Sequence, residues 1–250
     1  MNKYITMSIP EKLQLLFPPT KFVIVINGEG TGIVSVTITN KTEEDIICVK
    51  FTIRVAERII QLNSLLKCSD TGPDGTGTAL LTKVETFARQ TGITHIQLSD
   101  DSKIYICGNE IDLAYFKILT TGMSWYNKLG YFSTRHESDM RANSAFIASA
   151  IAAQLSQEIT TTFPPSSSDE TVQSYVNRLF TSIRQQEPIC TKEDITRGKY
   201  LQMIVNTLKG QISYNNQLTK DLTSQQGAGR CRRRTKRKKP NKKKRTRKHK

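Results

Sequence analysis

A glycine-rich loop between two apolar segments constrains this chain more than any other stretch. Residues 69–77 hold three glycines and a proline, and they follow the mostly apolar run 59–68. In residues 78–90 the apolar side chains recur at the spacing of one helix face, and Gly92 stands where such a helix would end. A second short apolar run covers 93–98. The pattern predicts strand, loop, helix and strand, with the helix packed on a sheet.

The loop is a candidate phosphate site, because it removes side chains where the helix begins. Free N–H groups and the positive end of the helix dipole then point at one place. Gly72 and Gly77 have the spacing of a Walker A loop, but Thr78 stands where the lysine belongs. Gly75 and Gly77 begin a dinucleotide fingerprint, but Leu80 replaces its third glycine. A connection that binds nothing is the alternative.

The net charge of +15 comes from one end of the chain. Of the 37 Lys and Arg residues, 15 lie in residues 230–250, which contain no acid, so the other 229 residues hold 22 basic and 22 acidic side chains. Because its like charges repel, this tail cannot fold alone. We expect it to bind the phosphate backbone of nucleic acid without reading sequence. A solubility tail and an acidic partner are the alternatives.

The same tail suits a nuclear-import signal read by an import receptor, with clusters at 232–239 and 242–245. A neutral body with a cationic tail would suit a nucleus, or the particle of a large DNA virus. The candidate nucleic-acid-binding residues are Arg232, Arg233, Arg234, Lys236, Arg237, Lys238, Lys239, Lys242, Lys243, Lys244 and Arg245.

The five cysteines are scattered and odd in number, with no CxxC, and none stands at zinc spacing from one of the three histidines. We therefore expect reduced thiols, no metal site and an intracellular protein, nuclear or cytoplasmic, that is not secreted. No signal peptide and no apolar run of 18 residues is recognisable, so no membrane span is expected.

The patterns divide the chain into a leader (1–20), a main domain (21–140), a helical extension (141–210) with a linker at 160–168, and a polar, then basic, disordered tail (211–250). In the main domain, alternating apolar residues predict an antiparallel meander of strands at 21–27, 33–39 and 47–55. Further helices are expected at 109–120, 144–159, 169–186 and 192–208. The helical extension either caps the sheet or binds a protein partner.

The segments GPDGTGTALLTKVETFARQTGITHIQL and SWYNKLGYF follow one another at a characteristic spacing. Together they resemble the [RQ]xxGxG[AG] loop, helix and strand, and then the FYxKLGF segment, of the GNAT superfamily of acetyl-CoA-dependent N-acetyltransferases. The resemblance covers roughly residues 32–132. It implies an α+β fold in three layers, with a mixed, largely antiparallel sheet and flanking helices.

The resemblance also implies a site. Strands 59–68 and 93–98 would splay apart and hold acetyl-CoA, and an amine would attack the thioester directly, without a covalent enzyme intermediate. Tyr126 would protonate the leaving thiolate. The implied cofactor-binding residues are Leu65, Leu66, Lys67 and Cys68 for the pantetheine arm, and Gly72, Asp74, Gly75, Thr76, Gly77 and Thr78 for the pyrophosphate.

This chain departs from the family pattern in three places. Residues 27–32 form only a tight turn where the family usually has two helices, between its first and second strands, that help to form the acceptor pocket. Gly72 stands where the loop normally has Arg or Gln, and the strand 59–68 carries no carboxylate that could serve as a general base. Asp70, Asp100 and Asp101 are substitutes for that base, and Asp100 is our candidate; turn or capping roles are the alternative. An aromatic cluster at the core edge is the alternative for Tyr126. If catalysis is lost, the protein would be a nucleic-acid-binding structural or packaging factor.

Overall fold

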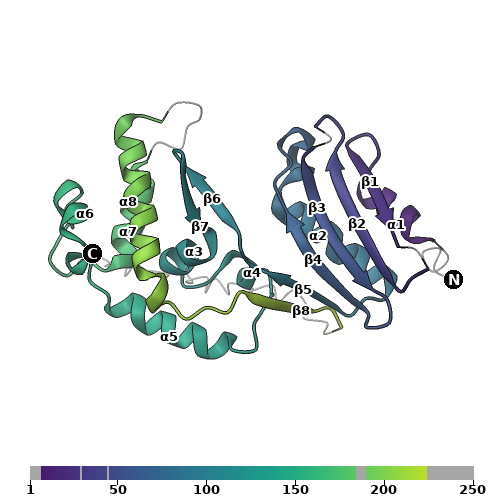
Figure 1. Cartoon of the computed structure of the whole chain (residues 1–250). Coiled ribbons are helices and arrows are strands. Elements are labelled where there is room, and N and C mark those ends of the chain that lie inside the picture. Colours follow the sequence, from purple (N-terminus) through teal and green to yellow (C-terminus); the bar gives the residue numbers. More distant parts are fainter. Residues whose placement is uncertain (1–6, 29, 44, 184–189, 224–250) are drawn as a thin grey trace, which may run out of the picture.

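A six-stranded sheet forms the larger core of the molecule (Figure 1). The computed structural model describes residues 7–28, 30–43, 45–183 and 190–223, without the side chains of Ser69 and Asp70. Strand order is β1-β2-β3-β4-β5-β8; β4 and β5 are parallel and every other neighbouring pair is antiparallel. The expected α+β fold with a mixed, largely antiparallel sheet is confirmed. The strands are β1 (Phe22–Asn27), β2 (Ile33–Asn40), β3 (Ile47–Arg54), β4 (Ile59–Leu65), β5 (His95–Ser99) and β8 (Gln217–Asp221).

Two helices bury the apolar face of this sheet. In α2 (Gly77–Thr91) the stripe that includes Leu80, Val84 and Phe87 is fully buried, and Gly92 ends the helix in the left-handed region at φ 76°. In α1 (Ile9–Leu16), Leu13 is fully buried in the same cluster. Each such side chain contributes roughly 1.5–3 kcal/mol on burial. Leu13 and Phe17, in the segment expected as a leader, therefore belong to the core.

A second hydrophobic cluster lies beside the sheet, in a part that we call the helical unit (Figure 1). It comprises a hairpin and five helices: β6 (Lys103–Ile106), β7 (Asn109–Asp112), α3 (Leu113–Thr121), α5 (His136–Ser149), α6 (Gln157–Thr162), α7 (Val172–Ser182) and α8 (Lys192–Leu208). Shorter turns of helix are η1 (Ser69–Gly75), α4 (Trp125–Lys128), η2 (Ala152–Gln154) and η3 (Lys209–Gln211). None of the described helices has the length and apolar character needed to cross a bilayer.

Several expected boundaries were wrong. Residues 109–112 form a strand rather than the start of a helix, because Cys107 and Gly108 adopt positive φ and turn the chain back into a hairpin. The alanine-rich helix begins at His136 and ends at Ser149, where Ile151 pairs with Thr171 instead. Residues 160–162 of the expected linker are helical, as the end of α6. The polar segment 217–221, expected in the tail, is an edge strand of the sheet.

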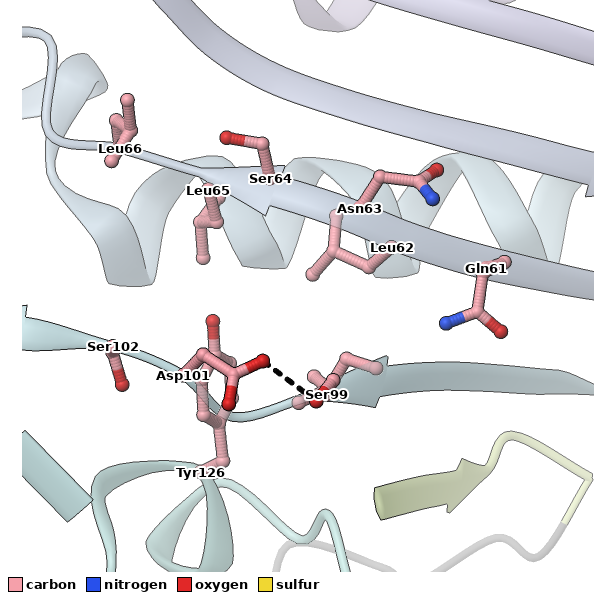
Figure 2. A pocket seen from close by; sticks show the side chains of 11 residues that line it. Gln61, Leu62, Asn63, Ser64, Leu65, Leu66, Ser99, Asp101, Ser102 and Tyr126 are labelled. Carbon is pink, nitrogen blue, oxygen red and sulfur yellow. Dashed lines mark hydrogen bonds between the residues drawn. The ribbon is translucent and has the colours of Figure 1, made fainter. Parts of the chain in front are cut away.

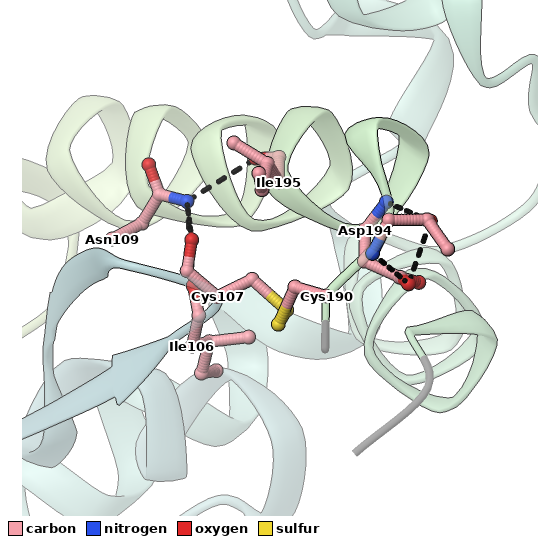
Figure 3. The surroundings of a disulfide bond; sticks show 7 residues. Ile106, Cys107, Asn109, Cys190, Asp194 and Ile195 are labelled. Atoms are coloured by element: carbon pink, nitrogen blue, oxygen red, sulfur yellow. Dashed lines mark hydrogen bonds between the residues drawn. A yellow bond between two sulfur atoms is a disulfide. The ribbon is translucent and has the colours of Figure 1, made fainter. Parts of the chain in front are cut away.

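Four of the five cysteines form disulfides, which corrects the expectation of reduced thiols. Cys48 is bonded to Cys68, and Cys107 to Cys190. The second bond joins the β6–β7 hairpin to the residue that precedes the cap of α8 (Figure 3). Beside it, the Asn109 side chain donates to the carbonyls of Cys107 and Ile195, at 3.1 and 3.2 Å. Cys231 lies outside the described residues.

Within residues 7–223, as far as the structure describes them, the chain crosses between the sheet and the helical unit four times. The crossings follow β5, α3, the α4 segment and α8, at residues 99–103, 121–125, 132–136 and 211–217. At the third crossing Phe132 forms an antiparallel β-bridge with Thr219 of β8, in which each amide donates to the other residue's carbonyl at 2.9 Å. The first crossing contributes Ser99, Asp101 and Ser102 to the cleft described below.

Candidate functional site

A cleft opens where the parallel strands β4 and β5 part (Figure 2). Their pairing runs from Ile59–His95 to Leu62–Leu98 and then stops. Beyond that point β4 stays paired with β3, across a bulge at Asn63, whereas the chain after β5 turns into the first crossing. The resulting cavity has a volume of about 310 Å³.

Residues of both strands and of α4 line this cavity. One wall is the continuous segment Gln61 to Leu66, the other contains Ser99, Asp101 and Ser102, and Tyr126 reaches in from α4 (Figure 2). The structure therefore brings together Leu65, Leu66 and Tyr126 of the predicted site. Lys67, Cys68 and the loop residues Gly72, Asp74, Gly75, Thr76, Gly77 and Thr78 do not line the cavity.

The position of Tyr126 follows from the cap of α4. Ser124 and Asn127 form a capping box that starts this one-turn helix. The Tyr126 ring packs edge-on against Trp125 and Tyr131, with centroids 4.7 and 5.8 Å apart, so it does belong to an aromatic cluster. Among the described residues its hydroxyl has no hydrogen-bond partner. Burial, and then the charge of Asp100, raise the pKa of Tyr126, so this hydroxyl keeps its proton.

Asp100 and Asp101 are neighbours in sequence but have different surroundings. The Asp100 carboxyl is buried outside the cavity, where Ser102 Oγ and Tyr214 Oη donate to it. Burial raises the pKa of Asp100. The exposed Asp101 carboxylate lines the cavity and accepts hydrogen bonds from Ser99 Oγ at 2.9 Å and Asn216 Nδ2 at 3.1 Å. The structure thus places Asp101, rather than the preferred candidate Asp100, at the cleft.

The glycine loop is tightly folded on itself. The Cys68 amide donates to the Gly75 carbonyl at 2.9 Å, and a Cβ on Gly75 would lie 1.8 Å from the Cys68 carbonyl oxygen. Gly72 adopts φ 66°, which favours glycine. Thr76 caps α2 through its side chain, which leaves the amides of Gly77 and Thr78 without an acceptor in the described part of the chain. Two amides at the start of α2 are therefore open to an anion.

Two lysines gather at this loop around Asp74. Lys21 Nζ lies 2.8 Å and Lys83 Nζ 3.5 Å from the Asp74 carboxylate. The hydrogen bond from Lys21, and then the charge of Lys83, hold the pKa of Asp74 below its usual value. The two lysines therefore offset the negative charge of Asp74 at the loop, which makes the loop less repulsive to an anion. Neither lysine was singled out from the sequence.

A buried polar cluster of Glu85, Tyr131 and Lys220 holds the segment that follows α4. Lys220 Nζ of β8 lies 2.7 Å from Glu85 Oε1 of α2 and also donates to the Leu129 carbonyl at 2.7 Å. Tyr131 Oη donates to the same Glu85 oxygen at 3.1 Å. Because Tyr131 packs on Tyr126, this cluster indirectly supports the wall of the cleft. Sequence reasoning missed it, since Glu85 and Lys220 are 135 residues apart.

The predicted nucleic-acid-binding residues of the tail lie outside the described residues. In the described part of the chain, no group of three or more His, Cys, Asp and Glu side chains could hold a metal ion.

No protein-family model matches the sequence, and no curated protein matches it. Among solved structures, the chain is similar to one described as the crystal structure of nourseothricin acetyltransferase. The two are 12% identical with a TM-score of 0.25, and the match covers 46% of this chain and 71% of that chain. A likeness with so low a TM-score does not decide the function of this chain.

Proposed function

We propose that the protein is a GNAT-type N-acetyltransferase that takes its acetyl group from acetyl-CoA. The observation that carries the proposal is the cleft between the parted strands β4 and β5, with the Tyr126 hydroxyl facing it. It coincides with the two sequence segments that resemble this family. The cleft, the loop and the tyrosine come from separate stretches of the chain, and the fold brings them to one end of the sheet.

The residues present fit such a cofactor at two points. Leu66 N–H donates to Cys48 O of β3, so the backbone of Leu65, one residue earlier, faces the side of the cleft and can bond an amide-bearing arm. The free amides of Gly77 and Thr78, with Lys21 and Lys83 nearby, would hold a pyrophosphate. Bound acetyl-CoA would supply an activated thioester.

The chain's own residues would then supply the proton that the leaving thiolate needs. Tyr126 Oη holds a proton at pH 7, as an ordinary tyrosine does, and can donate that proton to the departing sulfur as the amine nitrogen bonds to the acyl carbon; burial raises its pKa and so makes it a weaker acid. The amine's own proton leaves to water in the open mouth of the cleft. No side chain acts as a covalent nucleophile in this scheme.

Calorimetric titration of the full-length protein with acetyl-CoA tests the proposal. We expect saturable binding that Leu66→Trp weakens at least tenfold, because Leu66 lines the cavity yet is about half exposed and tolerates replacement. Leu15→Trp, at an exposed position on α1, is the matched control and should bind normally. No binding at millimolar acetyl-CoA would overturn the proposal and favour a fold retained without catalysis.

We further propose that the basic tail associates with nucleic acid. Its support is the sequence alone: 15 basic residues and no acid within 230–250. Neutralising several phosphates makes affinity fall steeply with salt. A chain truncated after Gly229 should lose binding to duplex DNA and RNA at moderate salt while keeping acetyl-CoA binding. Unchanged nucleic-acid binding by the truncated chain would exclude this role of the tail.

A further inference from the structure

Among the described residues that line the cleft, Asp101 is the only one with a charged side chain. The other polar groups there are neutral amides and hydroxyls, including Gln61, Asn63 and Ser102, and the rest of the wall is apolar. Figure 2 shows Asp101 beside Tyr126, on the wall opposite β4. The electrostatic interaction of the cleft with an entering molecule is therefore dominated by this one carboxylate.

Asp101 is held in place by neutral donors from two crossings. Ser99 Oγ bonds to one carboxylate oxygen and Asn216 Nδ2 to the other, at 2.9 and 3.1 Å. Asn216 immediately precedes β8, and Gln217 Nε2 in turn donates to Ser99 Oγ at 3.2 Å. Each carboxylate oxygen has lone pairs to spare after these bonds.

No cation in the described part of the chain pairs with Asp101. The pKa of Lys209 is raised, first by its hydrogen bond to Asp112 and to a smaller extent by the charge of Asp101. Lys209 forms its ion pair with Asp112, at 3.0 Å. An oriented carboxylate without a counter-ion, in a partly apolar cleft, attracts a cation and repels an anion.

We infer that Asp101 binds the ammonium group of the acceptor, so that the acceptor is a primary amine which enters the cleft as a cation and releases one proton to water before its nitrogen attacks. Anionic acceptors and neutral alcohols of the same shape are rejected. That the bound amine is the acceptor of an acetyl group rests on the proposed function. The preference of the cleft for a cation needs no cofactor. Asn216 is a positioning residue, since it acts through Asp101.

A probe pair that differs only in charge tests this selectivity. Benzylamine and benzyl alcohol have nearly the same shape, and each is titrated into the ¹⁵N-labelled full-length protein while the backbone amides of Ser99, Asp101 and Ser102 are followed by NMR. We expect benzylamine to bind at least tenfold more tightly than benzyl alcohol. Asp101→Asn should abolish the difference, and Asn216→Ala should reduce it. Glu43→Gln, in the β2–β3 turn, is the control and should keep it.

Equal binding of the two probes by the wild-type protein, or a preference that survives in Asp101→Asn, would overturn the inference. Titration of the same variants with acetyl-CoA separates this outcome from failure of the proposed function. If acetyl-CoA does not bind but the amine preference depends on Asp101, the acetyltransferase proposal falls and the cation site stands. If acetyl-CoA binds and the preference is absent, only the cation site falls.

Discussion

The Tyr214 hydroxyl donates a hydrogen bond of 2.5 Å to the buried carboxyl of Asp100, which lies 114 residues earlier in the chain. Tyr214 also lies 3.3 Å from Ser124 Oγ. These three residues come from three different crossings between the sheet and the helical unit. The two contacts therefore fasten three of the four crossings to one another.

Asp100 should make the protein less stable as the pH rises. Burial raises its pKa in the folded state above the ordinary value of 3.8, so the folded state binds a proton more tightly than the unfolded state does. Its contribution to the free energy of unfolding is full below the unfolded-state pKa and is lost as the pH rises through the folded-state pKa.

Urea unfolding of the wild type and of Asp100→Asn across pH 3 to 8 measures this contribution. Asp74 and Glu170 have lowered pKa values, so their contributions to stability change with pH in the opposite direction. These contributions are the same in both proteins and cancel when the two unfolding free energies are subtracted. We expect the wild type to lose stability relative to Asp100→Asn as the pH rises. A constant difference would show that Asp100 titrates normally.

Tyr126→Phe should slow acetyl transfer by roughly 10²-fold and leave acetyl-CoA affinity unchanged, because it removes only the donated proton. Steady-state kinetics and calorimetric titration measure the two quantities. Tyr105→Phe, at an exposed hydroxyl on β6, is the control and should behave as wild type. Equal loss of affinity and rate in Tyr126→Phe would instead indicate a packing defect.

Gly75→Ala should open the glycine loop. The added Cβ would stand 1.8 Å from the Cys68 carbonyl oxygen and 2.0 Å from Thr71 Oγ1, neither of which can move freely. We expect a loss of about 2–3 kcal/mol in the free energy of unfolding. Gly210→Ala has open space around it and should change stability by less than about 0.5 kcal/mol. Chemical denaturation compares the two, and equal effects would contradict the tight loop.

Lys220→Met should destabilise the protein by about 1–3 kcal/mol, because the buried Glu85 carboxylate loses the shorter of its two ion pairs and keeps only Arg89, at 3.3 Å. Lys50→Met, at an exposed position on β3, should cost less than about 0.5 kcal/mol. In the double variant Glu85→Gln/Lys220→Met, much of the loss should be recovered. Purely additive effects would show that the two side chains do not interact.

Reduction of each disulfide should lower the free energy of unfolding, and the bond that closes the longer loop should contribute more. By loop-closure entropy, Cys107–Cys190, which are 83 residues apart, is worth roughly 4–5 kcal/mol and Cys48–Cys68, 20 apart, about 3 kcal/mol. Peptide mapping under non-reducing conditions identifies the bonds, and urea unfolding of Cys107→Ser/Cys190→Ser and Cys48→Ser/Cys68→Ser measures their separate contributions. Free thiols at all four positions would contradict the pairing.

The sequence was a good guide where structure is local. The stripe and caps of α2 and α8, and the alternation in β2 and β3, depend on neighbours within a few residues, and these elements were predicted near their observed positions. Strand β8 was missed because its sequence, QLTKD, buries one apolar residue, Leu218, and takes its hydrogen bonds from β5. Edge strands of this kind have little sequence signal.

The site was predicted less completely than the fold, for the same reason. Leu65, Leu66 and Tyr126 lie in segments that resemble a known pattern. Adjacent residues such as Asp100 and Asp101 can face opposite sides, but only the packing of Tyr214 and Asn216 determines which carboxyl is buried and which lines the cleft. The cysteine pairs are likewise set by contacts between distant segments.

The four crossings also determine how the molecule can move. A lid joined to its body by one or two strands of chain can swing about a hinge at those points. The four connections seen in the described residues, three of them fastened together by Asp100, Ser124 and Tyr214, leave no single axis about which the helical unit could rotate. The cleft should thus be a rigid receptor of fixed width, and the sheet and helical unit should melt in one cooperative transition.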